Sequence, residues 1–174
     1  MVIELKKGRD GPSTLVCVRS DGTRTWGKVA RFFPVHDLTH CVVESLLGLN
    51  EAFFGLVASG WNIDEFATPG VAGRLPVEAV LAESIVGLLD LERGTGKEWS
   101  TSEFNDALAE SLRAQGRPLF RPIREEELAR TRALRDELQE RWEALAPGRV
   151  LSVSFPVDKS PSRRRGKGAD THAS

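Results

Sequence analysis

The order of β-prone and helical segments along the chain constrains its fold more than any other feature. Three short β-prone runs, residues 2–6, 14–18 and 23–29, are separated by turn residues that include Asp21-Gly22, a typical hairpin signal. Residues 150–157 alternate between polar and apolar side chains, as a half-buried strand does. Segments with helical periodicity lie between. We therefore predict an α+β fold, in which an N-terminal antiparallel meander and a C-terminal strand form a small sheet packed on a bundle of about five helices.

Proline, glycine and capping residues indicate where the helices begin and end. Pro34 suits a first helical turn, Asn50 can cap a helix, and Gly48 favours a helix end. Ser100 and Glu103 have the spacing of a capping box. The expected helices cover residues 34–47, 51–59, 76–91, 101–115 and 123–145, and residues 61–74 are expected to form a loop.

Length and charge indicate one globular domain with a tail. A chain of 174 residues is about one domain long, and we assign residues 1–157 to it. Residues 158–174 are rich in Ser, Pro, Gly and basic side chains, which predicts a disordered basic tail. The net charge of −1 argues against a dedicated nucleic-acid or anionic-membrane binder, with weak contacts of the tail as the exception.

Several further classes of protein are not favoured. No apolar run approaches the ~18 residues of a membrane helix, so no membrane insertion is expected. The N-terminal residues lack the apolar centre of a signal peptide, and Cys17 and Cys41 are too few for a disulfide scaffold. We expect a cytoplasmic protein. Nothing in the pattern assigns an oligomeric state.

The segment His36-Asp37-Leu38-Thr39-His40 is the strongest candidate for chemistry. At about 100° per residue, His40 lies about 40° from His36 around the predicted helix, Glu44 about 80° and Asp37 about 100°. Two imidazoles at positions i and i+4 can direct nitrogens at one point, as in helical zinc sites. We predict that His36 and His40 bind a divalent metal ion, zinc first, with iron or manganese as alternatives.

A carboxylate is expected as the third ligand. Glu44 is the nearest candidate on the same helix, and Glu51 is the second because the break at Gly48 can turn the chain back. Glu78 is a third candidate, although a Glu is ordinary in the first turn of a helix. Asp37 is either a further ligand or an orienting and proton-transferring acid, so Asp37 and Glu44 are the candidate catalytic residues.

The histidine segment resembles a known motif. It is similar to the HDxxH signature of the coenzyme Q biosynthesis protein Coq4 family, and residues 46–49 and 54–57 resemble that family's helix, glycine break and helix over about 25 residues. The resemblance implies zinc held by HDxxH plus a Glu, and action on a quinone-ring intermediate. It marks His36, Asp37 and His40 as metal-site positions. The family's Glu corresponds to Ala52 here, one residue after Glu51.

The motif also resembles the HExxH site of zincin proteases, with Asp37 in place of the Glu. Asp is one methylene shorter, so it would reach a water on the metal less easily. No further histidine follows at metzincin spacing, and protease activity is not favoured.

Two hypotheses for function follow. In the first, the chain is a metal-dependent enzyme of hydrolase or lyase type that acts on a small organic substrate. In the second, it is a non-enzymatic interaction or structural protein. There the His/Asp/Glu cluster is a closed metal site or a buried polar network, and the charged helix 123–145 offers a partner surface. An open coordination position distinguishes them, since only the enzyme needs one.

Overall fold

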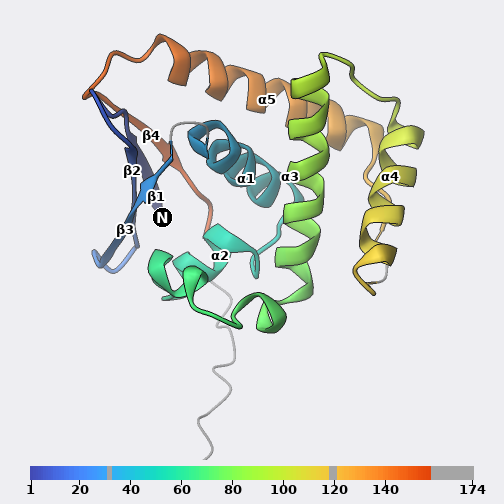
Figure 1. Cartoon of the computed structure of the whole chain (residues 1–174), viewed down its shortest axis with the longest axis horizontal. Coiled ribbons are helices and arrows are strands. Elements are labelled where there is room, and N and C mark those ends of the chain that lie inside the picture. The colour runs from blue at the N-terminus through green and yellow to red at the C-terminus, as the bar shows by residue number, and fades with distance from the viewer. Residues whose placement is uncertain (31–32, 118–120, 158–174) are drawn as a thin grey trace, which may run out of the picture.

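A four-stranded antiparallel sheet stands at one end of the molecule, with the helices on one side of it (Figure 1). The computed structural model describes residues 1–30, 33–117 and 121–157. The strand order is β3-β2-β1-β4, so the C-terminal strand joins the sheet of the N-terminal meander, as predicted, and it does so beside β1. The strands are β1 (Val2–Lys6), β2 (Ser13–Val18), β3 (Arg24–Val29) and β4 (Val150–Ser154). The predicted α+β fold is confirmed.

The described residues contain five α-helices and two short 3-10 helices. They are α1 (Phe33–Leu47), α2 (Phe53–Ala58), η1 (Ile63–Ala67), η2 (Ala72–Arg74), α3 (Val77–Thr95), α4 (Thr101–Ala114) and α5 (Glu125–Ala144). Gly48, with a φ of 67°, follows the last residue of α1, and Ser100 and Glu103 form the predicted capping box of α4. None of these helices combines enough length with enough hydropathy to span a bilayer.

Three local predictions are wrong. The second helix begins at Phe53 rather than at residue 51, and Asn50 does not cap it; the carboxylate of Glu44 in α1 accepts the first N–H groups of α2 instead. The expected loop 61–74 contains η1 and η2. The last strand ends at Ser154 rather than at residue 157, because Pro156 has no N–H to extend the ladder.

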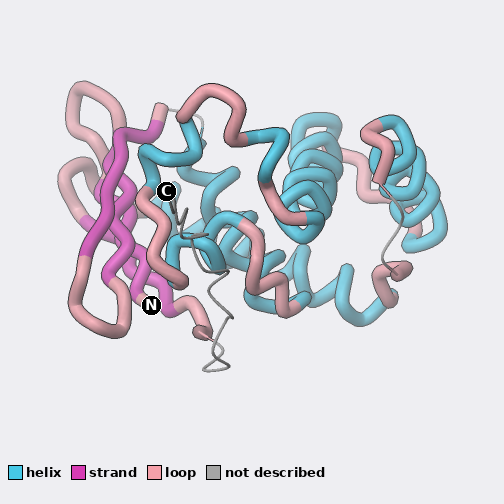
Figure 2. The backbone as a smooth tube through the Cα atoms, turned by 90° about the horizontal axis from the view of Figure 1, so that it is seen from below, coloured by secondary structure: helices cyan, strands magenta, loops and turns pink. Residues whose placement is uncertain are grey.

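Helix α1 lies between two hydrophobic clusters. The first joins the inner face of the sheet to α1, α2 and α5, and Leu38, Cys41 and Val42 are the buried residues that α1 contributes. The second joins α1 to α3, α4 and the start of α5, and it includes Val43 of α1. Figure 2 shows the same arrangement from another side, with the sheet at one end of the molecule. One face of α1 is thereby held against α3. The predicted tail, residues 158–174, lies outside the described residues.

Two ion-pair groups connect α5 to the rest of the chain. Glu92 of α3 is buried and accepts hydrogen bonds from Arg132 and from the backbone N–H of Trp99, while Arg135 lies 3.9 Å away. At the start of α5, Glu127 pairs with two arginines, Arg121 and Arg124, at 2.7 Å and 2.9 Å. The first group is buried and the second lies at the surface.

Candidate metal centre

The two histidines of the HDxxH segment lie on the face of α1 that meets α3. His40 and Glu44 are buried, and His36 and Asp37 are half-buried. The ring centroids of His36 and His40 are 4.8 Å apart, with an interplanar angle of 65°. The helical spacing therefore brings the two imidazoles together, as predicted.

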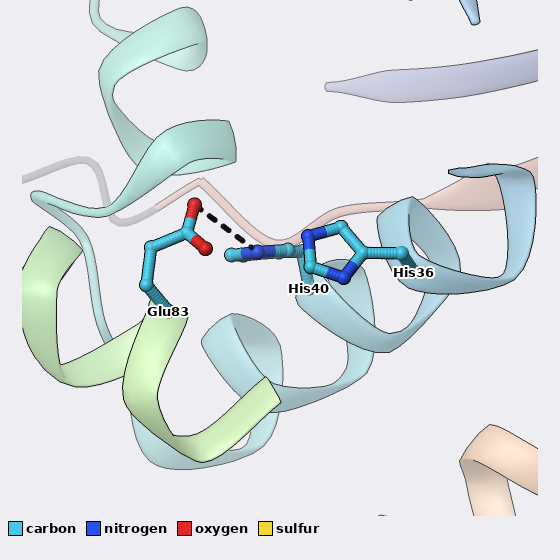
Figure 3. A group of neighbouring side chains, drawn as sticks. All are labelled: His36, His40 and Glu83. Carbon is cyan, nitrogen blue, oxygen red and sulfur yellow. Dashed lines mark ion pairs between the residues drawn. The ribbon is translucent and has the colours of Figure 1, made fainter. Parts of the chain in front are cut away.

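Helix α3 adds a carboxylate to the two imidazoles. Glu83 extends from α3 toward His40, and its Oε1 lies 3.5 Å from Nε2 of His40 (Figure 3). One ligand atom from each of His36, His40 and Glu83 lies within 4.8 Å of the others. Two imidazoles and a carboxylate form a donor set that suits zinc, iron or manganese.

Glu44 contacts His40 and is not one of the three potential ligands His36, His40 and Glu83. Its Oε1 lies 3.2 Å from Nδ1 of His40, and its Oε2 accepts the N–H groups of Phe54 at 2.8 Å and Gly55 at 3.2 Å. Both carboxylate oxygens are thus engaged. With Nδ1 directed at Glu44, the other ring nitrogen, Nε2, is the one that faces Glu83.

Like His40, His36 has a carboxylate partner at its Nδ1 atom. Its Nδ1 lies 2.8 Å from Oδ2 of Asp90 in α3, and Asp90 also pairs with Arg93 at 3.1 Å. Each imidazole of the pair therefore has a carboxylate at Nδ1. Metal-binding histidines in proteins usually have such a partner, because it fixes the tautomer and the orientation of the ring.

The acid–base properties of the site are perturbed. Burial lowers the pKa of His40, but hydrogen bonds with Glu44 and Glu83 outweigh it and raise that pKa to about 9. The same bond with His40 lowers the pKa of Glu83. Burial raises the pKa of Asp37 to about 6, against the opposing effect of the two histidines. Several perturbed groups at one place are typical of functional sites.

One side of the site is open to solvent. The side chain of Glu83 is 61% exposed, whereas that of His40 is 4% exposed. Those of His36 and Asp90 are each 24% exposed. The two histidines are therefore the more buried part of the site, and Glu83 is its most exposed residue.

The three carboxylates predicted from the sequence as candidates for the third ligand lie outside the group of His36, His40 and Glu83. Glu44 touches His40, as described above. Glu51 is exposed, and its backbone N–H donates to Oε2 of Glu78 at 2.7 Å, so these two residues contact each other outside the group of three. Glu78 lies in the first turn of α3, where a carboxylate is favoured in any helix.

Sequence reasoning missed Glu83 and Asp90. They are seven residues apart on α3, which puts them on one helix face within about 20° of each other. Two acidic residues on one face of a largely apolar helix were a usable signal. Their approach to His36 and His40 depends on how α3 packs on α1, which no local pattern predicts.

Comparison with protein-family models, with curated proteins and with solved structures finds no match to this chain. The resemblance to the coenzyme Q family therefore stays a prediction, and function has to be inferred from the residues of the site.

Proposed function

We propose that this protein binds a divalent metal ion, zinc first, through His36, His40 and Glu83. The observation that supports this best is the approach of the three ligand atoms to within 4.8 Å, with both imidazoles held at Nδ1 by carboxylates. In this proposal Glu83 is the carboxylate ligand in place of Glu44 or Glu51, the candidates predicted from the sequence, and Glu44 orients His40. Iron and manganese remain alternatives, since two histidines and one carboxylate also suit them.

We further propose that the site is catalytic. Zinc enzymes commonly bind the metal with three protein ligands and keep a further position for water or substrate, whereas structural zinc sites are closed by four. The exposed position of Glu83 leaves such a position accessible. An ion held there would polarise a substrate oxygen or activate water, which suits a hydrolase or lyase acting on a small organic substrate.

The chain's own residues take distinct roles in this proposal. Glu44 and Asp90 would hold the two imidazoles at Nδ1 and so orient their rings for binding an ion. Asp37 is the residue we assign to proton transfer, because it follows His36 on α1 and interacts electrostatically with His36, His40 and Glu83. A carboxylate in that position can take a proton from a reacting group and return it.

One observation favours the competing hypothesis of a polar network without metal. His40 lies between Glu44 and Glu83, and His36 pairs with Asp90, so carboxylates already compensate the imidazoles. A buried histidine satisfied in this way can serve the fold alone.

Metal analysis of purified protein separates the two hypotheses. We expect roughly one zinc ion per chain in the wild type, loss of the ion in His40→Ala, and a large fall in affinity in Glu83→Gln. Glu83 is exposed, so its variant should still fold, with a small fall in melting temperature because the pair with buried His40 is lost. Glu51→Gln is the matched control and should bind zinc normally.

Two outcomes would contradict the proposal. Absence of stoichiometric zinc in the wild type after reconstitution would favour the polar network. Loss of zinc in Glu51→Gln but not in Glu83→Gln would restore the ligand assignment made from the sequence.

A further inference from the structure

The outer face of the sheet has no helix packed on it among the described residues. In Figures 1 and 2 the helices lie on one side of the sheet only. Strand alternation directs Ile3, Leu5, Leu15 and Cys17 inward, so the residues between them face outward. The outward residues of the first three strands are Val2, Glu4, Lys6, Thr14, Val16, Val18, Arg24, Trp26 and Lys28.

Trp26 is the most unusual member of this outer face. Its exposed fraction is 62%, whereas Trp142 is buried and Trp61 and Trp99 are half-buried. It lies on β3, an edge strand, directly across from Val16 of β2. Large exposed aromatic side chains that the core does not need are enriched at binding surfaces.

Basic side chains surround Trp26 on the same face. Arg24 and Lys28 are two residues before and after it on β3, which places them about 13 Å apart along the strand. Lys6 lies in the same cross-strand row as Lys28, with Thr14 between them. Within the described ranges none of these three cations forms an ion pair. Glu4, the one acidic residue of the outer face, lies in the cross-strand row of Trp26, with Val16 between them.

We propose that this outer face binds single-stranded nucleic acid, with a base stacked on Trp26 and phosphates against Arg24, Lys28 and Lys6. Sheet faces that bind single strands combine an exposed aromatic ring with basic side chains in this way. The net charge of −1 argued against a nucleic-acid binder, but it is a sum over the whole chain. A single face of the molecule can be basic even when the whole chain is slightly acidic. This inference is independent of the metal site.

The charges also decide against a second copy of the chain as the occupant. Two outer faces packed against each other would bring the same cations together, and such like-charge contacts oppose association. An acidic peptide would satisfy the cations, but it offers a ring to the indole only where it contains an aromatic residue. Single-stranded nucleic acid supplies both phosphates and planar bases.

Binding can be measured with the full-length chain and a fluorescein-labelled single-stranded RNA of about ten nucleotides, within the site sizes known for such faces. The buffer contains a chelator, so that the metal site does not contribute. We expect binding at low salt that weakens as salt rises, together with quenching of tryptophan emission that is lost in Trp26→Ala. Trp26→Ala should weaken binding about 5- to 150-fold, and Trp26→Phe should retain most of it.

Charge variants give a second measurement. The double variant Arg24→Glu/Lys28→Glu should weaken binding and reduce its salt dependence, because two phosphate contacts are lost. The double variant Lys97→Glu/Arg130→Glu, at two exposed positions outside the sheet, is the matched control for the same change in charge and should bind as the wild type does. Trp26, Arg24 and Lys28 are exposed, so melting temperatures should stay unchanged.

Three results would overturn the proposal. The first is no binding at low salt. The second is binding unaffected by Trp26→Ala but lost when the three arginines Arg163, Arg164 and Arg165 are replaced by Ser, which would assign it to the tail. The third is tighter binding of a labelled poly-glutamate peptide than of the RNA, which would make an acidic polypeptide the partner.

Discussion

Replacing Glu44 by Gln tests whether this carboxylate orients His40 or binds the metal directly. Three N–H groups point at the two oxygens of Glu44, namely those of His40 Nδ1, Phe54 and Gly55. A Gln side chain has the same shape but only one acceptor oxygen, because its other terminal group is an NH2 donor. In either amide orientation, at least one buried N–H then faces a donor.

The size of the effect follows from these contacts. A buried donor without an acceptor costs about 1–3 kcal/mol, so the free energy of unfolding should fall by about that amount. If the imidazole instead moves its proton so that Nδ1 accepts from the amide, Nε2 carries the N–H and cannot bind a metal ion. Loss of such a supporting carboxylate typically costs about 10- to 100-fold in metal affinity, or about 1.4–2.8 kcal/mol.

Two assays on one protein check this reasoning. Urea denaturation of the metal-free protein gives the change in stability, and zinc competition with a chromogenic chelator gives the change in affinity. Glu51→Gln is the control, since that side chain is exposed and outside the site. Unchanged values in both assays would refute the orienting role. Complete loss of zinc with wild-type stability would make Glu44 a direct ligand.

Three further predictions concern residues that stabilise the fold. Gly55→Ala should destabilise the fold by about 1–3 kcal/mol or more, since a Cβ there would lie 2.1 Å from the backbone oxygen of Asn50; an unchanged denaturation midpoint would contradict this close approach. Glu92→Ala should lower the free energy of unfolding by up to about 3–5 kcal/mol, because half-buried Arg132 loses its carboxylate partner and buried Arg135 keeps only Asp136, whereas the exposed control Glu98→Ala should change it little. Hydrogen bonds with its two arginines lower the pKa of Glu127 to about 2, so its stabilising effect is present above pH 4.5 and is lost as the pH falls toward 2. Glu127→Gln should therefore lose about 1 kcal/mol at neutral pH and show a flatter stability curve in that pH window, and parallel curves for the two proteins would refute this.

The features that local chemistry determines could be predicted, and those that depend on packing could not. The spacing of His36 and His40 follows from helical periodicity, and the helix end at Gly48 follows from its freedom to adopt a positive φ. The position of Glu83 depends on the packing of α3 against α1, forty-odd residues apart in the chain. The neighbouring Asn50 was expected to cap α2, but Glu44 of α1 accepts the N–H groups at the start of α2 instead.

The carboxylate of Glu44 does two things at once: it accepts hydrogen bonds from the start of α2, and it orients His40. Its hydrogen bonds to the amides of Phe54 and Gly55 therefore depend on the same atoms that hold the imidazole. If the folded start of α2 favours ion binding by fixing Glu44 and thus His40, thermodynamic reciprocity requires the ion to favour the folded start of α2 to the same extent. Hydrogen exchange at these two amides should accordingly slow when zinc binds, so that a backbone segment reports whether the ion is present.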